Sequence, residues 1–289
     1  MVAEFKQPQT LDEALALLAQ HGDEAKVLAG GTDLMQQLAH KQLSPGVLVH
    51  IEGISELSGI SSNRSLTIGT LTSHRDLATS KKLEKHFESL RGAANLVGGW
   101  QTQIAGTLGG NICNGSPAAD LAAPLLIHDA HLTLQSKSRG ERRLAVNEFL
   151  QGRRKTARAP DELVTHFQIE APPPSSHDLY LKVGRRGATE VAIVGLALRL
   201  TLKEDGETVE DVRIATCAVG PVPQRIPTAE AILNQHQLTS QAVDAACDAL
   251  LASSAPIDDV RGSASYRNAL LPRLLRRALD RTRISSQRQ

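Results

Sequence analysis

The sequence predicts a mixed α and β protein, and three observations support this expectation. Apolar residues make up 41% of the 289 residues, which is ordinary for a globular chain and excludes disorder as the main state. The 22 glycines and 13 prolines imply many turns, and therefore several short elements instead of a long helical bundle. Short apolar runs also alternate with helical periodicity along the chain. This length is enough for one large domain or two ordinary ones.

The first third of the chain is predicted to alternate helices and strands. Residues 10–13, Thr-Leu-Asp-Glu, match a capping box, and leucines at helical spacing follow them. We therefore expect a helix that ends near residues 21–22. The elements expected after it are a strand at 26–29, a helix at 34–38, strands at 47–51 and 66–69, and a helix from Thr72 or Ser73.

The last third is predicted to hold strands and then helices. Residues 171–176, Ala-Pro-Pro-Pro-Ser-Ser, are the best candidate for a linker. Strands are expected after it at 179–183, 191–202 and 209–219, with Asp205-Gly206 as the turn of a hairpin. The helical patterns that follow lie at 227–233 and 240–251, and a final helix is expected to begin at Pro272.

The charges argue against nucleic acid as a partner. The 32 basic and 31 acidic residues nearly cancel, so no global field recruits a polyanion. With only 4 Phe, 2 Tyr and 1 Trp, the chain also has few platforms on which bases stack. Residues 261–289 carry eight arginines and one acid, Asp280. This basic tail is either a docking surface for an acidic partner or a solvated helix face, and the sequence leaves both interpretations open.

Cysteine usage and hydropathy predict the compartment. Cys113, Cys217 and Cys247 lie far apart without a C-x-x-C motif, so a zinc or iron–sulfur site is not expected. Their odd number, and an N-terminus that does not resemble a signal peptide, indicate a reducing cytoplasm. The longest apolar stretch, 191–198, is far shorter than the ~20 residues of a membrane helix, so no membrane association is expected.

The first candidate binding segment is 27–34, Val-Leu-Ala-Gly-Gly-Thr-Asp-Leu, where a strand, a glycine pair and a helix start follow one another. Consecutive glycines allow successive N–H groups to point into one concavity, and a helix N-terminus adds partial positive charge. This geometry suits a pyrophosphate, and Thr32 has a hydroxyl to donate. Glycine pairs at strand ends are also common turns, so both interpretations stay open for this motif alone.

The second candidate segment lies within residues 98–120, which contain six glycines and a single charged residue, Asp120. Ordering each glycine costs extra backbone entropy, so this density indicates backbone that approaches something closely. Residues 106–111, Gly-Thr-Leu-Gly-Gly-Asn, predict a second backbone concavity, and Asp120 is an acceptor for ribose or ribityl hydroxyls. Two such segments fit a diphosphate held from both sides. Neither is a G-x-G-x-x-G or a P-loop, which disfavours a Rossmann or nucleotide-triphosphatase interpretation.

Several segments together carry a family resemblance. They are Ala-Gly-Gly-Thr-Asp-Leu at 29–34, Gly-Thr-Leu-Gly-Gly-Asn-Ile at 106–112, Ser-Pro-Ala-Ala-Asp at 116–120, Lys-Val-Gly-Arg-Arg at 182–186, Ala-Ile-Val at 192–194 and Arg-Gly-Ser-Ala-Ser-Tyr-Arg at 261–267. In this order, over essentially the whole chain, they resemble the FAD-binding medium subunit of the xanthine dehydrogenase and carbon monoxide dehydrogenase family of molybdenum hydroxylases.

The resemblance implies an α+β fold in two parts. Residues 1–174 are expected to form a FAD-binding domain of the vanillyl-alcohol-oxidase (PCMH) type, with subdomains at about 1–55 and 56–174. Residues 175–289 are expected to form a domain like the C-terminal part of the carbon monoxide dehydrogenase flavoprotein, with a three-stranded antiparallel sheet and a helical bundle.

The resemblance also implies cofactor-binding positions, with the diphosphate held by 27–34 and 107–111. Asp120 is expected to bind ribityl or ribose hydroxyls, and Leu163 and Lys182 to approach the flavin. The full set is Val27, Leu28, Ala29, Gly30, Gly31, Thr32, Asp33, Leu34, Thr107, Leu108, Gly109, Gly110, Asn111, Asp120, Leu163 and Lys182. No catalytic acid or base and no metal site are assigned to this chain.

The function that the resemblance implies is electron transfer. Substrate would be oxidised at a molybdenum cofactor on a large subunit, and electrons would pass through [2Fe–2S] clusters of a small subunit to non-covalent FAD here. NAD, oxygen or another acceptor would then be reduced, and a dimer of heterotrimers, a heterohexamer, is expected. The alternatives are a flavin-free structural subunit that docks partner chains and, less well supported, a standalone FAD oxidase.

The chain departs from the family pattern at some positions. Relatives often have Gln-x-Arg-Asn where residues 101–104 read Gln-Thr-Gln-Ile, and Leu181 stands where an aromatic residue is common. A cysteine-rich loop for an additional iron–sulfur cluster is not expected.

Some further residues have two interpretations each. His128 and His131 are interpreted as a surface or cap pair, not as metal ligands. Cys113 either approaches the flavin or is a buried, unreactive thiol. Trp100 either shields the flavin or packs beneath a loop. Arg185 and Arg186 face an anionic partner or form surface salt bridges.

Overall fold

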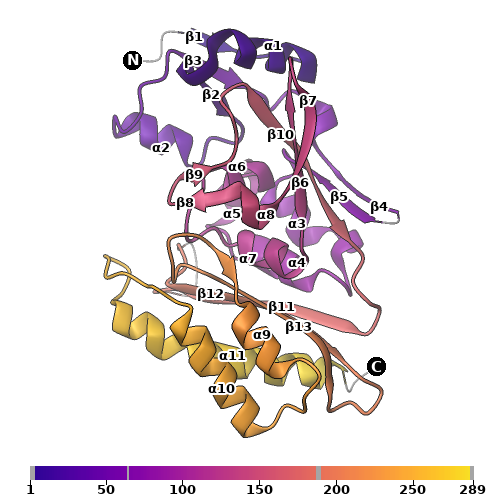
Figure 1. Ribbon diagram of the computed structural model, residues 1–289. Coiled ribbons are helices and arrows are strands. Elements are labelled where there is room, and N and C mark those ends of the chain that lie inside the picture. The colour runs from indigo at the N-terminus through magenta and orange to yellow at the C-terminus, as the bar shows by residue number, and fades with distance from the viewer. Residues whose placement is uncertain (1–3, 64, 187–189, 287–289) are drawn as a thin grey trace.

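The chain folds into three successive sheets with helices between and around them. The computed structural model describes residues 4–63, 65–186 and 190–286, so the last three residues of the basic tail lie outside it. The sheets follow one another from the N-terminal to the C-terminal end of the molecule (Figure 1). No helix in the described part of the chain is long and apolar enough to cross a bilayer.

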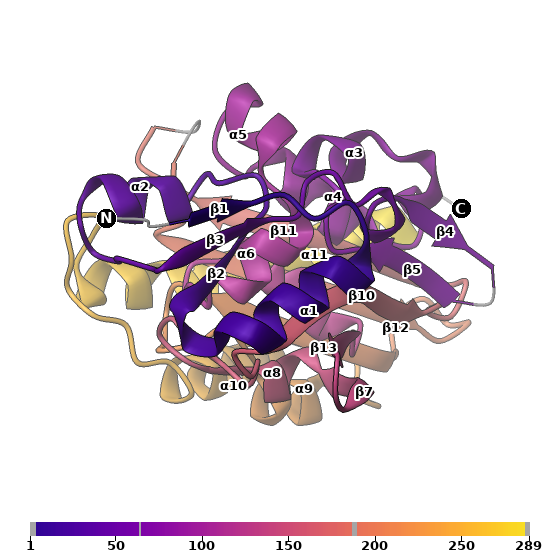
Figure 2. The same cartoon turned by 90° about the horizontal axis from the view of Figure 1, so that it is seen from above.

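The first sheet is parallel and small. Its strands are β1 (Glu4–Lys6), β2 (Ala25–Leu28) and β3 (Val47–His50), in the order β1-β3-β2. Helix α1 (Leu11–His21) lies alongside β2 and β3 (Figure 2) and starts as predicted, because Thr10 Oγ1 accepts the Glu13 N–H at 3.2 Å. A short helix, α2 (Leu34–Ala39), follows β2.

The second sheet is antiparallel, in the order β4-β5-β10-β6-β7. Its strands are β4 (Ile60–Ser62), β5 (Ser65–Gly69), β6 (His131–Ser136), β7 (Gly140–Ala145) and β10 (Glu162–Glu170). The helices around it are α3 (His74–Thr79), α4 (Glu88–Asn95), α5 (Trp100–Ala105), α6 (Leu108–Cys113), α7 (Ala122–Ile127) and α8 (Val146–Phe149). A separate hairpin consists of β8 (Leu150–Gly152) and β9 (Lys155–Thr156). Short 3₁₀ helices cover Gly22–Glu24, Ser55–Leu57 and Lys81–Leu83.

The third sheet corrects the expected strand number. Beside β11 (Ser176–Val183), β12 (Val194–Leu202) and β13 (Val209–Cys217), a fourth strand, β14 (Gln224–Arg225), pairs with β13. The sequence did not predict β14 because two residues are too short to show an alternating pattern.

The helices that follow are α9 (Pro227–Leu233), α10 (Ser240–Ala252) and α11 (Ala264–Ser286). The prediction that the last helix begins at Pro272 is wrong. Ser263 Oγ accepts the Tyr266 N–H at 3.1 Å and starts α11 there, so Pro272 lies inside the helix.

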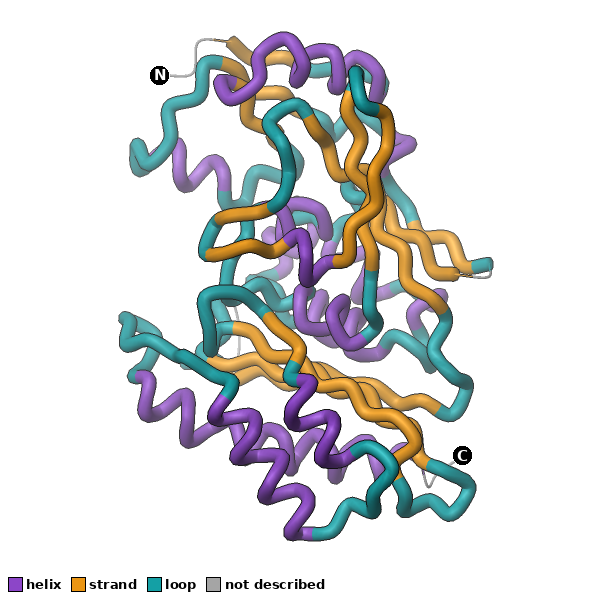
Figure 3. The backbone as a smooth tube through the Cα atoms, viewed as in Figure 1, coloured by secondary structure: helices purple, strands orange, loops and turns teal. Residues whose placement is uncertain are grey.

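Strand β12 occupies the middle of the C-terminal core, and every one of its residues is buried. Helix α11 packs against it on one side, while α7 contacts it from the side of the second sheet. Figure 3 shows this sheet between helices above and below it. Burial on both faces explains why residues 194–198 are continuously apolar, and the buried Arg199 and Thr201 further along have polar partners in Asp211 and Ser176.

A buried carboxylate connects the third sheet to the second. Asp178 of β11 accepts hydrogen bonds from the Glu88 and Ser89 N–H groups, each at 3.0 Å, at the start of α4. It also accepts one from the Ser89 hydroxyl, and His128 Nε2 lies 2.9 Å from it. His128 was expected in a surface or cap pair; the surface interpretation is wrong, because the side chain is buried with a partner 50 residues away, whereas His128 is indeed the C-cap residue of α7.

Candidate functional site

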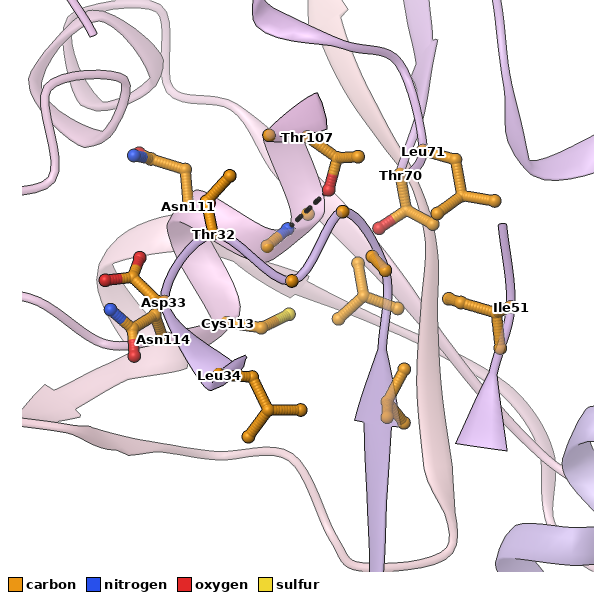
Figure 4. A pocket seen from close by; sticks show the side chains of 18 of the residues that line it. Thr32, Asp33, Leu34, Ile51, Thr70, Leu71, Thr107, Asn111, Cys113 and Asn114 are labelled. Carbon is orange, nitrogen blue, oxygen red and sulfur yellow. Dashed lines mark hydrogen bonds between the residues drawn. The ribbon is translucent and has the colours of Figure 1, made fainter. Parts of the chain in front are cut away.

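A cavity of about 440 Å³ lies where the first and second sheets meet, which is a size typical of small-molecule sites. The loop between β2 and α2 forms one wall, and the start of α6 with strand β10 forms another (Figure 4). Most of the predicted cofactor-binding residues line it. These are Val27, Ala29, Gly30, Gly31, Thr32, Asp33, Leu34, Thr107, Gly109, Gly110, Asn111 and Leu163.

The loop after β2 presents unpaired backbone donors to this cavity. Gly31 has φ +69°, a left-handed conformation that glycine adopts without strain. Within the described residues, the N–H groups of Gly30, Gly31, Thr32 and Asp33 have no hydrogen-bond acceptor. Gly30 and Gly31 are half-buried, where backbone donors are normally paired, whereas Thr32 and Asp33 are exposed to solvent. The unpaired donors of the two glycines therefore favour a ligand rich in acceptor oxygens.

The second glycine segment is different, because its backbone donors are already used. The N–H groups of Leu108 and Gly109 donate to the carbonyls of Thr72 and Thr70, at 3.0 and 2.8 Å. The Gly110 N–H donates to Thr107 Oγ1 at 3.0 Å, the dashed line in Figure 4. The predicted second concavity of free N–H groups is therefore absent from residues 108–110.

The glycines of the second segment instead permit close packing. A Cβ on Gly109 would lie 1.8 Å from Thr70 Oγ1, and a Cβ on Gly106 would lie 2.9 Å from His74 Nε2. The two segments also touch each other, since a Cβ on Gly30 would lie 1.5 Å from the Ala105 carbonyl oxygen. The second segment therefore supports the first one and supplies the cavity wall.

The cavity has a polar end and an apolar end. Asp33 and Asn114 lie together on the side of α2, whereas Ile51 and Leu71 lie on the opposite side (Figure 4). The buried Leu163 belongs to the same apolar cluster as Ile51 and Leu71. A ligand with one large apolar ring system and one polar half matches this lining.

Asp120 and Lys182 were predicted to contact the cofactor, but they do not line the cavity. They form a buried ion pair, with Lys182 Nζ 2.8 Å from Asp120 Oδ2, and Lys182 also donates to the Leu96 carbonyl at 2.8 Å. Tyr180 donates its hydroxyl to Asp120 Oδ1 at 2.7 Å. Burial raises the pKa of Asp120, and the two donors oppose that rise. Because Val97 lines the cavity, the ion pair lies next to its wall.

Leu28 and Leu108 are the other predicted positions outside the lining, because both side chains are buried in the core. Tyr180 was missed by the sequence analysis. It stands two residues before Lys182 on β11, so strand periodicity places both side chains on one face. That alternation was the available signal, whereas nothing in the sequence marked Asp120 as their shared partner.

Cys113 lines the cavity, and burial raises the pKa of its thiol to about 11, with Arg158 opposing the shift. The thiol is therefore protonated at neutral pH and unreactive. Trp100 neither lines the cavity nor packs beneath a loop. The residue is 57% exposed, and Cζ of the Arg75 guanidinium lies 4.1 Å from the centroid of its ring. The described residues contain no cluster that could hold a metal ion.

The comparisons with known proteins decide the family. Residues 2–172 match the model of the FAD binding domain in molybdopterin dehydrogenase, and residues 179–282 match the model of the CO dehydrogenase flavoprotein C-terminal domain. The chain belongs to this family of FAD-binding medium subunits. The mixed α and β fold, with a PCMH-type domain followed by a flavoprotein C-terminal domain, is thereby confirmed.

Similar proteins cover nearly the whole medium subunit. The carbon monoxide dehydrogenase medium chain of Hydrogenophaga pseudoflava is 32% identical over 278 residues, which is 96% of each chain. The xanthine dehydrogenase FAD-binding subunit of Escherichia coli O157:H7 is 32% identical over 282 residues, 96% of this chain and 95% of that one. A solved carbon monoxide dehydrogenase from Hydrogenophaga pseudoflava superposes with a TM-score of 0.93, at 32% identity, over 99% and 98% of the two chains. These relatives are subunits of dehydrogenases, so the family is one of oxidoreductases.

Proposed function

We propose that this chain binds FAD non-covalently in the cavity and serves as the electron-transfer subunit of a heterotrimeric molybdenum hydroxylase. Bound FAD supplies the redox chemistry, receiving electrons from [2Fe–2S] clusters of a small subunit and passing them to NAD, oxygen or another acceptor. The observation that carries the proposal is the run of unpaired N–H groups at Gly30–Asp33, which lies in a chain of an FAD-binding family.

The protein's part in this function is to hold and orient the dinucleotide. The N–H groups of residues 30–33 and the hydroxyls of Thr32 and Thr107 are placed to donate to diphosphate oxygens. Leu163 offers an apolar wall for the isoalloxazine ring. These contacts fix where the redox-active ring lies, and the ring itself supplies the redox step.

The buried pair of Asp120 and Lys182 is proposed to meet the flavin side of the cofactor. Both carboxylate oxygens of Asp120 already accept hydrogen bonds, from Tyr180 and from Lys182. A ribityl hydroxyl therefore reaches Asp120 only by sharing an oxygen with one of these donors. The pair places an ammonium group and a carboxylate together next to the cavity wall, so it adds almost no net charge there.

The partner chains are proposed from the relatives. The Hydrogenophaga pseudoflava relative is named a medium chain. A large molybdenum-cofactor subunit and a small iron–sulfur subunit, assembled as a dimer of heterotrimers, follow from that likeness. We also propose that residues 1–174 and 175–289 are separate domains. A cytoplasmic location agrees with the free thiols of all three cysteines.

An absorbance spectrum of the purified protein tests the proposal, followed by examination of the supernatant after acid precipitation. Flavin bands near ~450 nm, and FAD in the supernatant, are the expected results. Colour that stays with the precipitate would mean a covalent flavin. A protein that stays colourless after FAD is added, alone and with its partner chains, would contradict the proposal and leave a flavin-free structural subunit.

Electron transfer has its own test once the partner chains are purified. The complex with substrate should bleach the flavin band, and a complex without the small subunit should not. Flavin that bleaches at the same rate without the small subunit would contradict the proposed route.

A further inference from the structure

The hairpin of β8 and β9 contributes Arg154 and Thr156 to the lining of the cavity. Its turn residues are Arg153 and Arg154, and Arg154 has φ +57°. The Arg154 N–H donates to the Gly115 carbonyl at 2.8 Å, just beyond the end of α6. A Cβ on Gly115 would lie 3.1 Å from Arg154 Cα, so the turn packs directly against this segment. The hairpin therefore has a fixed position relative to α6.

Arg154 lines the cavity, and its side chain, unlike its backbone N–H, has no partner among the described residues. Arg158, the neighbouring cation, donates its Nη1 to the carbonyls of Ala159, Pro160 and Glu162. In contrast, the Arg154 guanidinium forms no hydrogen bond or ion pair with another described residue. Lys26 is a second such cation in the lining, but it comes from β2.

The position of Arg154 places it near the end of the cavity where the adenosine half of FAD would lie. The unpaired donors of residues 30–33 lie near the start of α6, and Arg154 lies near its end. Six helical residues separate these points by about 9 Å. If the diphosphate is at the start of α6 and the isoalloxazine is at the apolar end with Leu163, the adenosine half extends toward Arg154.

The chemistry of this end agrees with an adenosine group. Gln37 Nε2 donates to Asn114 Oδ1 at 3.3 Å, so two amide side chains form a polar wall next to the hairpin. Asp33 adds a carboxylate to the same end, and a cation is needed to offset it beside a diphosphate. A planar guanidinium both supplies that charge and stacks on an aromatic base.

We propose that Arg154 binds the adenosine half of the dinucleotide, with its guanidinium stacked on the adenine, and thereby selects FAD over FMN. This inference rests on the proposed function. It assigns to the hairpin a role in cofactor selection, whereas the amides of residues 30–33 hold the diphosphate that FAD shares with ADP.

Equilibrium binding to the full chain freed of flavin tests this, with FAD, ADP and FMN as ligands. Arg154→Ala should raise the Kd for FAD and for ADP by about five- to thirtyfold and leave the Kd for FMN unchanged. Arg153→Ala is the matched control, because Arg153 is in the same turn but does not line the cavity, and all three Kd values should stay the same. Arg154→Gly, in which glycine suits the positive φ, should weaken the binding of FAD and ADP as much as Arg154→Ala does.

Three results would overturn the inference. Equal FAD affinity of Arg154→Ala and wild type would show that Arg154 does not contact the cofactor. Full affinity in Arg154→Lys would show that charge alone is required and that no stacking occurs. A wild-type chain that binds no FAD would overturn the proposed function together with this inference, and the first two results are distinguishable from it because they require wild-type binding.

Discussion

The glycine pair after β2 and the glycine pair in α6 line the same cavity, but their backbone donors have different partners. The N–H groups of Gly30 and Gly31 have no acceptor among the described residues, whereas those of Gly109 and Gly110 donate to Thr70 and to Thr107. A glycine pair therefore does not by itself make a phosphate site. A glycine pair forms a binding loop when its N–H groups find no acceptor in neighbouring segments, and a packing contact when they do.

The point where the two segments touch should be the most sensitive. In Gly30→Ala the new Cβ would lie 1.5 Å from the Ala105 carbonyl oxygen, which is backbone and cannot rotate away. We expect a loss of more than about 3 kcal/mol in the free energy of unfolding, together with loss of FAD binding. Urea unfolding and the flavin content of the purified protein measure the two effects.

Gly92→Ala is the control for Gly30→Ala. Gly92 lies inside α4, and a Cβ there has no neighbour within 4 Å. Because alanine is the better helix former, this variant should gain up to about 1 kcal/mol and keep its flavin. Equal stability of the two variants would contradict the proposed contact between the segments.

His74 supports the second segment and predicts a pH dependence. Its backbone N–H donates to the Gly106 carbonyl at 3.0 Å. Burial of its side chain lowers the pKa of the imidazole from 6.5 to about 4. Between these values the unfolded chain binds the proton more strongly, so acidification favours unfolding. As the pH falls from 6.5 to 4, this difference in pKa lowers the free energy of unfolding by about 3 kcal/mol.

Urea unfolding at several pH values measures this contribution. His74→Gln should show a shallower fall in unfolding free energy than wild type between pH 6.5 and 4, because its side chain does not titrate. Parallel curves for the two proteins would show that the His74 pKa is not lowered in the folded state.

Gly109→Ala should act on packing more than on cofactor binding. Its Cβ would lie 1.8 Å from Thr70 Oγ1 and 2.8 Å from the Thr70 carbonyl oxygen, so we expect a loss of about 2 kcal/mol in unfolding free energy. Thr70→Ala in the same chain removes the closer of these contacts and should restore part of the stability. If the double variant is no more stable than Gly109→Ala, Thr70 Oγ1 is not the obstacle.

Gly31→Ala should have the smallest destabilising effect, about 1 kcal/mol, because the left-handed φ of +69° is strained while the nearest atoms, Met35 Cγ at 3.0 Å and Leu28 Cδ1 at 3.2 Å, belong to side chains that can move. The same change disturbs the loop that presents the free donors, so FAD should bind more weakly. Titration with FAD, at a temperature where the Gly31→Ala and Gly109→Ala variants are both folded, compares the FAD affinity of the two. A larger loss of affinity in Gly109→Ala would reverse the roles assigned to the two segments.

Local signals in the sequence were enough to predict much of the fold. Helix α1 and helix α10 begin where Thr10 and Thr239 accept the N–H group three residues later, and such caps are visible as short motifs. The final helix was placed too late because Pro272 was interpreted as a start, although a serine at residue 263 provides the cap. The glycine pairs of both predicted segments line the same cavity, and their role in binding the cofactor stays a prediction.

Contacts between distant residues were not predictable in the same way. Asp178 meets His128 across 50 residues, and Lys182 meets Asp120 across 62. No periodicity in the sequence links such partners, because each pair forms only when the third sheet packs against the helices around the second sheet. The same limit explains why the hairpin around Arg154 was not among the predicted site residues: its place beside α6 follows from the tertiary fold.

Amide hydrogen exchange with and without FAD tests the central claim most directly. The account predicts that FAD slows exchange in residues 30–33, whose N–H groups gain acceptors, and changes it much less in residues 108–110, whose N–H groups already have them. If FAD binds and residues 30–33 exchange as fast as before, the unpaired donors do not hold the diphosphate, and the assignment of the cavity is wrong.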